Sequence, residues 1–353
     1  MTPGPTRVPE RVLAAGARPM IHHRSAEFSK ELADVLALIG PLFGTKQPVL
    51  PVHATGRGAM EAAISNLFSP GDEIASGCNG RFGEMWARIA EAFGLVVHRF
   101  STDWSQDLDL DAFDAIVDRH PGVRALTITY CDTSTGVRND VAAAARRASA
   151  GNVLTLVDGV SAIGGMPFRF DEWGVDVAIT ASQKCLMSSP GLAFAALSDR
   201  AWNARRTSRL PRGYFDFEET RAFITRPSPA PPGTPPVHAM LQVAEALRMI
   251  HEEGLERVFR RHEDMAHRAR TGVASLGLKM QCPRLAAHAP TVTAIALPEN
   301  VSPLTLRDGM RSRGIETAEA LGPYGDSAFR IGHMGDIRLE DVERTLSTLK
   351  DVL

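Results

Sequence analysis

The chain has no long apolar run and no block of like charges, and both absences exclude classes of protein. None of its apolar stretches approaches the ~20 residues that a membrane-spanning helix needs. Its 39 lysines and arginines nearly balance its 41 aspartates and glutamates. Without a basic cluster it lacks the charge pattern of a protein that binds nucleic acid or an anionic membrane. We therefore expect neither kind of partner.

Cysteine is also scarce, and the four residues are scattered without the spacing of metal ligands. Reduced thiols of this kind are typical of a cytosolic protein. The N-terminal residues show neither the apolar core of a signal peptide nor an arginine-rich targeting helix. These observations predict a soluble, cytoplasmic protein that holds no metal.

What the sequence does contain is a regular alternation of short apolar runs and helical patterns from about residue 49 to residue 198. The expected strands are Val49–Val52, Glu73–Ser76, Leu95–Arg99, Arg124–Tyr130, Val153–Val157, Asp176–Thr180 and Leu192–Leu197. The helices expected between them include Ala59–Phe68, Phe82–Phe93, Leu110–Arg119 and Asn139–Ala150. This alternation predicts an α/β fold with a mostly parallel sheet covered by helices on both faces.

A proline-rich stretch, residues 226–236, can be neither a helix nor a central strand. It is either a linker or a stiff loop, and we favour the loop because a helix pattern follows directly. Two later strands, Val292–Leu297 and Phe329–Gly332, are flanked by helix patterns and predict a smaller α+β domain. The expected organisation is an arm at residues 1–20, a large domain at 21–252 and a small domain at 253–353.

Two of the expected strands lead to a single charged residue. The strand at Val153–Val157 leads to Asp158, and the strand at Asp176–Thr180 leads through a short polar stretch to Lys184. Charges at the ends of buried strands are costly unless they are paired or functional, and ligands of open α/β sheets bind there. A carboxylate for a ring nitrogen and a lysine for an imine are what pyridoxal phosphate (PLP) requires. A structural ion pair between Asp158 and Lys184 is the alternative.

Two helix starts could contact a ligand. Thr55-Gly56-Arg57 combines glycine with a helix N-terminus, which favours an anion. A glycine-rich turn between a strand and a helix is usually only a turn, and this one matches neither a P-loop nor a dinucleotide fingerprint. Asn79-Gly80-Arg81-Phe82-Gly83 opens the next helix in the same way. Phe82 could pack on a flat ring, although a phenylalanine at a helix start more often belongs to the core.

Two further segments could contact a polar substrate. Asp132-Thr133-Ser134-Thr135-Gly136 follows the strand that ends at Tyr130, and its oxygens suit either ligand contacts or the capping of a helix. Arg330 lies in an otherwise apolar strand and needs a partner. A substrate carboxylate would match its planar fork, and a salt bridge between domains is the competing explanation.

Together these segments resemble the class V aminotransferases of fold type I, in particular the alanine–glyoxylate, serine–glyoxylate and serine–pyruvate aminotransferase group. The resemblance covers essentially the whole chain, from Pro3-Gly4-Pro5-Thr6 to Arg330-Ile331-Gly332-His333-Met334-Gly335. It is most specific at Asp158-Gly-Val-Ser-Ala-Ile-Gly-Gly165, Ser182-Gln183-Lys184 and Thr133-Ser134-Thr135-Gly136. It implies the PLP-dependent transferase fold, with seven strands in the large domain's sheet.

The resemblance gives each matching residue a role. Lys184 would hold PLP as an imine and later move the substrate proton, and Asp158 would keep the pyridine nitrogen protonated. Phe82 and Val160 would pack on the two faces of the ring, and Arg330 would bind the substrate carboxylate. The phosphate would be held by Thr55, Gly56, Arg57 and Gln183. Thr133 would contact the ring oxygen or the substrate. Thr234 would reach across a homodimer interface to the phosphate of the neighbouring subunit.

Three positions depart from the family pattern. Pro231 stands where some relatives have a tyrosine that binds the partner's phosphate. Arg57 stands where some have a histidine, so Arg57 could supply the missing donor. Tyr130-Cys131 stands where many have a histidine, which leaves the amino donor open.

The expected function is transfer of an amino group from alanine or serine to glyoxylate or pyruvate, by a ping-pong mechanism in a homodimer with interfacial active sites. Transaminases of ureidoglycine, pyridoxamine or 2-aminoethylphosphonate are alternatives, as is a PLP lyase of the cysteine-desulfurase type. A desulfurase needs a mobile nucleophilic cysteine, and the surroundings of Cys282 do not resemble such a loop. A non-enzymatic binding protein would leave Lys184, Asp158 and Arg330 without a function.

Overall fold

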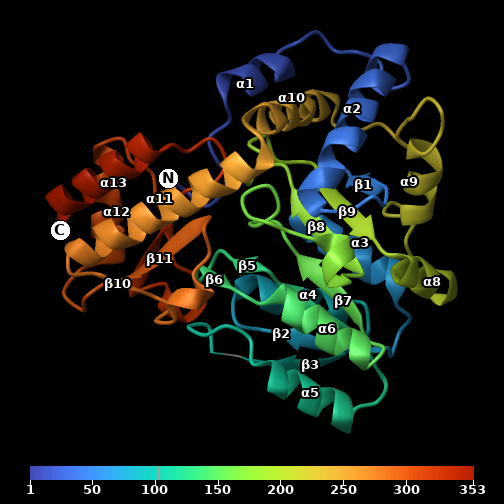
Figure 1. The fold of residues 1–353 in the computed structure, drawn as a ribbon, viewed down its shortest axis with the longest axis horizontal. Coiled ribbons are helices and arrows are strands. Elements are labelled where there is room, and N and C mark those ends of the chain that lie inside the picture. Colours follow the sequence, from blue (N-terminus) through green and yellow to red (C-terminus); the bar gives the residue numbers. More distant parts are fainter. Residues whose placement is uncertain (102) are drawn as a thin grey trace.

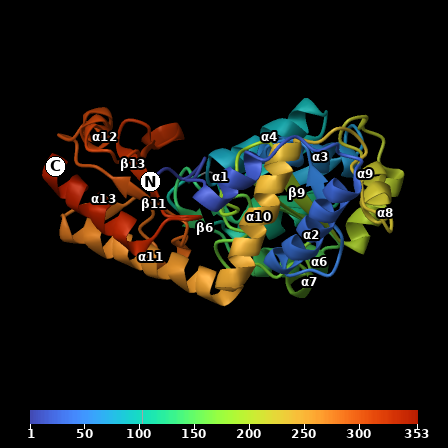
Figure 2. The same cartoon turned by 90° about the horizontal axis from the view of Figure 1, so that it is seen from above.

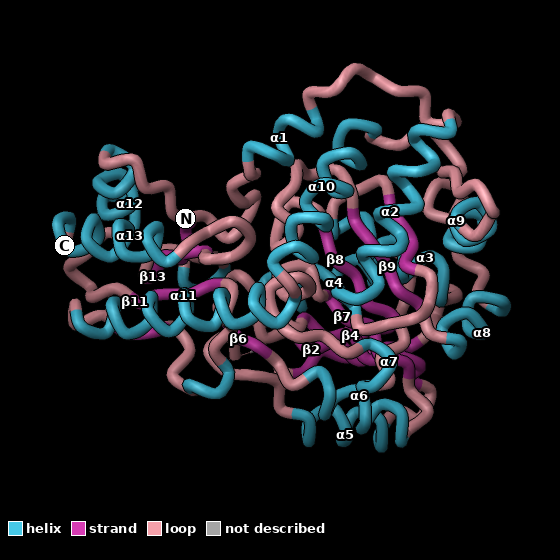
Figure 3. The backbone as a smooth tube through the Cα atoms, turned by 45° about the horizontal axis from the view of Figure 1, so that its top comes forward, coloured by secondary structure: helices cyan, strands magenta, loops and turns pink. Residues whose placement is uncertain are grey.

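The computed structural model describes residues 1–101 and 103–353, which build two main sheets lying side by side (Figure 1, Figure 3). A third sheet is a short antiparallel pair, β5 (Cys131–Asp132) and β6 (Val137–Arg138). In the larger sheet β9 runs antiparallel to both of its neighbours, and the other strands run parallel to one another. This confirms the expected mostly parallel seven-stranded sheet. In spatial order its strands are β1 (Val49–Val52), β9 (Ala193–Leu197), β8 (Val177–Ala181), β7 (Leu154–Asp158), β4 (Val123–Thr129), β2 (Glu73–Gly77) and β3 (Val96–Phe100).

Helices cover both faces of this sheet because alternate strand residues point to opposite sides. In β8, Val177 and Ile179 join one buried cluster, whereas Ala178 joins the other. The first cluster packs against α3 (Gly56–Leu67), α4 (Arg81–Ala92), α8 (Asp199–Thr207) and α9 (Phe217–Ile224). The second packs against α2 (Ala26–Phe43), α5 (Leu110–Arg119), α6 (Val141–Ala150), α7 (Phe170–Trp173) and α10 (Val237–Glu253).

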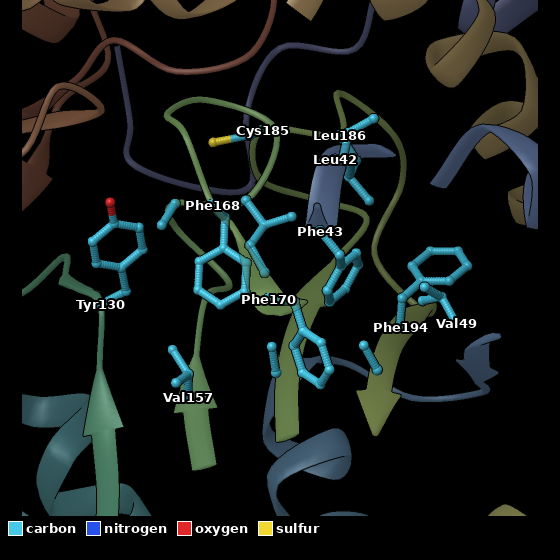
Figure 4. Close-up of a cluster of buried hydrophobic side chains, with 14 of the residues drawn as sticks. Leu42, Phe43, Val49, Tyr130, Val157, Phe168, Phe170, Cys185, Leu186 and Phe194 are labelled. Atoms are coloured by element: carbon cyan, nitrogen blue, oxygen red, sulfur yellow. The ribbon is translucent and has the colours of Figure 1, made fainter. Parts of the chain in front are cut away.

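The second cluster is rich in phenylalanine. Phe43, Phe170 and Phe194 come from a helix, a short helix and a strand, and Figure 4 shows their rings close together beside the strands. All three are fully buried. Each such side chain stabilises the folded state by roughly 1.5–3 kcal/mol relative to exposure. The strands that carry the candidate site are thus held by a rigid core.

The smaller sheet is antiparallel throughout and lies at the side of the larger part (Figure 2). Its strands, in spatial order, are β10 (Lys279–Met280), β11 (Val292–Ala296), β13 (Ala328–Gly332) and β12 (Ala318–Glu319). Phe329 and Ile331 of β13 pack against the helices of this part. Arg330 between them therefore faces the other way, toward the larger sheet. The helices are α11 (Leu255–Ser275), α12 (Pro303–Ser312) and α13 (Leu339–Val352).

Helix α2 was not expected from the sequence, although its pattern is present. Ser25 accepts a hydrogen bond from the Phe28 backbone N–H at 3.1 Å and so caps the helix start. The buried residues Phe28, Leu32, Val35 and Ile39 then follow one face of a helix. The proline-rich stretch is confirmed as a loop between α9 and α10.

The N-terminal arm carries a short helix, α1 (Glu10–Gly16), which lies beside α10 (Figure 1). The arm at residues 1–20 and the domain bounds at residues 252 and 253 stay predictions. Near that boundary Gly254, with φ 86°, separates α10 from α11 and allows the chain to change direction. Among the described residues no helix is long and apolar enough to cross a bilayer.

Candidate active site

The carboxyl ends of the parallel strands bring the predicted residues to one edge of the larger sheet. Asp158 is the last residue of β7, a central strand that pairs with β4 on one side and β8 on the other. Lys184 follows the end of β8, and its neighbour in the sheet is the strand that ends in Asp158. This is the edge at which open α/β sheets bind ligands.

Asp158 is a buried carboxyl group without a cationic partner. One of its oxygens accepts a hydrogen bond from the Val160 backbone N–H at 2.8 Å. Burial raises the pKa of Asp158 to about 7, an effect that the Val160 N–H and Lys184 only partly offset. No salt bridge joins it to Lys184 or to any other residue in ranges 1–101 and 103–353. The alternative of a structural Asp158–Lys184 ion pair is therefore wrong.

Lys184 is partly buried, and its ammonium group has no carboxylate partner within the described part of the chain. Its Nζ donates a hydrogen bond to the carbonyl oxygen of Pro3. Burial, together with the nearby Arg330 guanidinium, lowers the pKa of Lys184 to about 8. A lysine in this state has an appreciable neutral fraction near neutral pH, and the neutral amine is the nucleophile.

The N-terminal segment covers Lys184, which the sequence did not predict. Thr6 donates its backbone N–H to the Gln183 carbonyl at 3.0 Å and its hydroxyl to the Lys184 carbonyl at 3.0 Å. A Cβ at position 4 would lie 2.5 Å from Lys184 Cδ, so glycine is required there. The carbonyl of Met1 accepts the N–H of Gly332 at 2.8 Å. Residues 1–6 thus run between the two sheets, and the only signal for this was the Pro3-Gly4-Pro5-Thr6 motif itself.

Asp132 and Ser134 cap a helix rather than face a ligand. One oxygen of Asp132 accepts the backbone N–H of Phe82 at 2.9 Å and, more weakly, that of Gly83 at 3.4 Å. Ser134 Oγ accepts the N–H of Arg81 at 3.0 Å. The start of α4 is therefore already capped by side chains of the chain itself, which agrees with the helix-capping alternative for the segment that carries Asp132 and Ser134.

Thr133, between these two capping residues, keeps its hydroxyl free. Its Oγ1 is buried and, among the residues that the structure describes, has no hydrogen-bond partner. The side-chain oxygen of Gln183, next to Lys184, is buried and unpartnered in the same way. Buried polar atoms are rarely left unpaired, so both fit a site that a polar ligand completes.

Arg330 joins the two sheets without a carboxylate. Its Nε donates to the Glu319 carbonyl at 2.7 Å, and its Nη1 donates to the Thr133 carbonyl at 2.5 Å. Burial lowers the pKa of its guanidinium to about 10. Within the described ranges it makes no salt bridge, so the competing explanation of an interdomain salt bridge is wrong. The guanidinium is bound to the larger part by a neutral carbonyl instead.

The start of α3 differs from that of α4. Among the described residues the Thr55 side chain makes no capping hydrogen bond, so the first N–H groups of this helix are left for another acceptor. Gly56 is buried and packs closely against Val160: a Cβ at position 56 would lie only 2.6 Å from Val160 Cγ2. Arg57 is exposed and lines a cleft of about 180 Å³ between α3 and α4.

The remaining predicted residues are less constrained by contacts. Phe82 and Val160 are partly buried, and both pack against the same apolar cluster. Thr234 is exposed in the proline-rich loop, and no hydrogen bond of its side chain is seen within the described chain. Tyr130, at a position that departs from the family pattern, makes a contact within the fold: its hydroxyl donates a hydrogen bond to the Pro167 carbonyl at 3.0 Å.

A doubly covered α/β sheet with a lysine and an aspartate at the carboxyl ends of central strands is the architecture of fold type I transferases. Comparison with known families agrees. Residues 4–322 match the aminotransferase class-V family, and the chain belongs to that family. It is an aminotransferase family enzyme.

Similar proteins span the whole chain. It is 39% identical to the soluble hydrogenase small subunit of Synechococcus sp. (strain PCC 6716), over 100% of this chain and 92% of that one. It is 37% identical to the L-aspartate–glyoxylate aminotransferase of Paracoccus denitrificans, over 95% of this chain and 86% of that one. The crystal structure of ureidoglycine–glyoxylate aminotransferase from Bacillus subtilis matches with a TM-score of 0.94 at 28% identity, over 100% of this chain and 92% of that one.

The contrast between Asp132 and Thr133 gives a stability prediction. Asp132→Ala should lower the free energy of unfolding of the ligand-free protein by roughly 2 kcal/mol, because the N–H groups at the start of α4 lose their acceptor. Thr133→Val should change it by less than about 0.5 kcal/mol, because the hydroxyl has no partner to lose. Urea unfolding followed by circular dichroism measures both. Equal losses would show that the Thr133 hydroxyl has a structural partner.

Proposed function

We propose that this protein is a PLP-dependent aminotransferase that transfers an amino group from alanine or serine to glyoxylate or pyruvate. The observation that carries the proposal is a set of three ionisable groups that lack ionic partners in the described chain: the buried Asp158 and Arg330 and the partly buried Lys184. Each is expensive to bury alone. A cofactor with one cationic ring nitrogen and one aldehyde, and a substrate with one carboxylate, supply the three missing partners.

The residues present fit PLP. Asp158 would accept the N–H of the pyridine ring, Lys184 would bind the aldehyde carbon, and the open start of α3 would receive the phosphate. Further contacts would come from Thr55, Gly56, Arg57, Phe82, Thr133, Val160 and Gln183. When bound, PLP supplies an electron sink that stabilises negative charge at the substrate Cα.

Lys184 is suited to carry the substrate proton. Its pKa of about 8 lies near physiological pH, which is where a group exchanges protons with least cost in either direction. Its amine is already turned toward the N-terminal segment, where Pro3 accepts its hydrogen bond. Once released from the cofactor, the amine would remove the proton from the substrate Cα and deliver it to C4′ of the cofactor.

Arg330 is suited to orient the substrate. Its guanidinium holds two backbone carbonyls, and a carboxylate is a stronger acceptor than either. Two parallel N–H···O bonds fix the plane of an amino acid or a 2-oxo acid. Fixing that plane places the Cα–H bond relative to Lys184, and such positioning lowers the barrier to proton transfer.

The closeness of the N-terminal segment to Lys184 supports a small substrate. Pro3 and Gly4 lie against the lysine side chain, and a Cβ at position 4 would lie 2.5 Å from Lys184 Cδ. Alanine and serine add one or two heavy atoms beyond Cα, and glyoxylate adds none. Glyoxylate also occurs in the names of the Paracoccus and Bacillus relatives. Aspartate is the second candidate donor because the Paracoccus protein is named for it.

The cysteines do not support the desulfurase alternative. All four are free and buried. Burial raises the pKa of Cys131 and of Cys185 to about 12 and also raises the pKa of Cys282. A desulfurase needs an accessible thiolate, which these environments disfavour.

We further propose a homodimer in which Thr234 completes the phosphate site of the partner. The loop that carries it is rigid because it is rich in proline, and Thr234 itself is exposed in the single chain. With proline at position 231 in place of the family's tyrosine, Arg57 would supply a further donor to the same phosphate.

The function is tested by a donor and acceptor panel on PLP-loaded enzyme. Alanine and serine should each convert the cofactor to its amine form, and glyoxylate and pyruvate should restore it; aspartate, ureidoglycine, pyridoxamine and 2-aminoethylphosphonate serve as competitors.

Lys184→Ala should show no turnover, and borohydride should fix PLP to Lys184 in the wild type. The rate of cofactor capture should rise with pH and level off above about 8, because the lowered pKa leaves the amine neutral there. Hydrogen evolution is assayed in parallel because one similar protein is named as a soluble hydrogenase subunit. Hydrogen evolution without transamination, or sulfide release from cysteine without transamination, would overturn the assignment.

Arg330→Lys tests the carboxylate contact. The variant should lose at least ~100-fold in kcat/KM for alanine and for serine alike, because an ammonium group cannot form two parallel bonds to a planar carboxylate. The absorption spectrum of bound PLP should stay nearly unchanged. Arg313→Lys, at an exposed arginine of the same part of the chain, is the matched control and should keep full activity. Normal activity of Arg330→Lys would mean that the carboxylate binds elsewhere.

Mixed dimers test the contribution of Thr234. Thr234→Ala should weaken PLP binding roughly tenfold, the value of one hydrogen bond to a charged group. When Lys184→Ala and Thr234→Ala subunits are unfolded and refolded together, one site of each mixed dimer has both native residues if Thr234 acts across the interface. Activity at limiting PLP should then exceed that of either variant alone. No recovery in dimers that mass spectrometry shows to be mixed would place Thr234 in its own subunit's site or in none.

A further inference from the structure

Three potential metal ligands meet at a place that the proposed function does not use. Glu73 begins β2, His98 lies on β3, and His120 directly follows α5. Their ligand atoms all lie within 4.8 Å of one another. Glu73 is at the amino end of β2, whereas the candidate active site is at the carboxyl ends of the strands. The cluster is therefore on the opposite edge of the larger sheet.

Secondary structure brings the three side chains together. β2 and β3 are parallel, with Ala75 opposite His98, so Glu73 and His98 lie diagonally on one face of the sheet. His120 ends α5 at the start of a turn, and Gly122 in that turn lies close to Glu73: a Cβ there would be 3.0 Å from Glu73 Oε1. Glycine at position 122 thus leaves room for the carboxylate.

The separations agree with a shared ion. His98 Nε2 lies 2.7 Å from Glu73 Oε2, and His120 Nδ1 lies 3.9 Å from the same oxygen. Ligands about 2.0–2.1 Å from a tetrahedral ion are roughly 3.3 Å apart, so each separation needs to change by about 0.6 Å. The two imidazole rings stack with centroids 3.9 Å apart, and His120 is the more exposed, with 35% of its side chain accessible. His120 therefore has room to turn its ring toward the ion.

We propose that Glu73, His98 and His120 form a binding site for one divalent transition-metal ion of the zinc class. Two imidazole nitrogens and one carboxylate oxygen are the ligand types that zinc takes in sites with three protein ligands. The carboxylate balances half of the ion's charge, and the partly exposed position leaves the remaining coordination to water. A hydrogen-bonded Glu73–His98 pair alone would not need the second histidine stacked beside it.

The test is zinc titration by calorimetry on untagged, EDTA-treated protein that still carries its PLP. The wild type should bind one zinc ion per chain, and zinc should raise its melting temperature. His120→Gln and His98→Gln should each weaken zinc binding by roughly tenfold or more, since losing even an outer partner of a metal site weakens binding 10–100-fold. Aminotransferase activity of both variants should be unchanged because the site is remote from Lys184.

Two controls make the result specific. His267→Gln removes an exposed histidine of α11, and the double variant His22→Gln/His23→Gln removes the adjacent pair that precedes α2; both should bind zinc like the wild type. Electron paramagnetic resonance of the Cu²⁺-loaded wild type should show two nitrogen ligands, a readout that needs no variant to fold. Absence of saturable zinc binding to the folded wild-type protein, or a zinc affinity of His120→Gln and His98→Gln equal to that of the wild type, would overturn the proposal.

Discussion

The structure depends on burying ionisable groups that the chain itself does not neutralise. Burial shifts the pKa of each toward its neutral form: that of Asp158 rises to about 7, that of Lys184 falls to about 8, and that of Arg330 falls to about 10. A stable fold alone has no use for such groups, because apolar residues of similar size would cost less. Their retention at one place is explained by a ligand with matching charges. The rest of the molecule keeps these groups close together and out of water.

Two distant parts of the chain close the site around Lys184. The N-terminal segment holds the lysine from one side through Pro3 and Thr6. β13 brings Arg330 from the smaller sheet, and the bond from Arg330 to the Thr133 carbonyl connects the two sheets directly. A carboxylate that bound Arg330 would compete with that carbonyl. If Arg330 binds the substrate as we propose, substrate binding and the contact between the two parts of the chain would be coupled through a single guanidinium.

Local sequence patterns predicted the central sheet well because most of its strands are buried on both faces. Such strands are uninterrupted apolar runs bounded by glycine and proline, and their carboxyl ends must meet along one edge. Asp158 and Lys184 could therefore be found without any knowledge of register. The pattern of Phe28, Leu32 and Val35 was equally local, so α2 could have been predicted from it.

Other features could not be read from local patterns because they join residues that are far apart in the sequence. Nothing near Asp132 indicates that its carboxylate caps α4, since an acidic residue after a strand suits a ligand equally well. The position of residues 1–6 beside Lys184 follows only from the packing of the two sheets. For the same reason the sequence suggested no metal site. Glu73, His98 and His120 meet because of a strand register and a helix end, not because of their spacing.

The metal-ligand cluster lies at an exposed end strand of the larger sheet. β3 is an end strand, with one side of its backbone unpaired within the sheet, and Val96 on it is 47% exposed. Edge strands of this kind invite pairing with other chains unless they are covered or charged. His98 is bound to Glu73 of the neighbouring strand, and its ring is covered by His120 from the end of α5. An ion shared by the three would tie the edge strand to the strand inside it and to the helix that covers it. The same sheet would then carry a catalytic site at the carboxyl ends of its strands and a stabilising metal site at the opposite end.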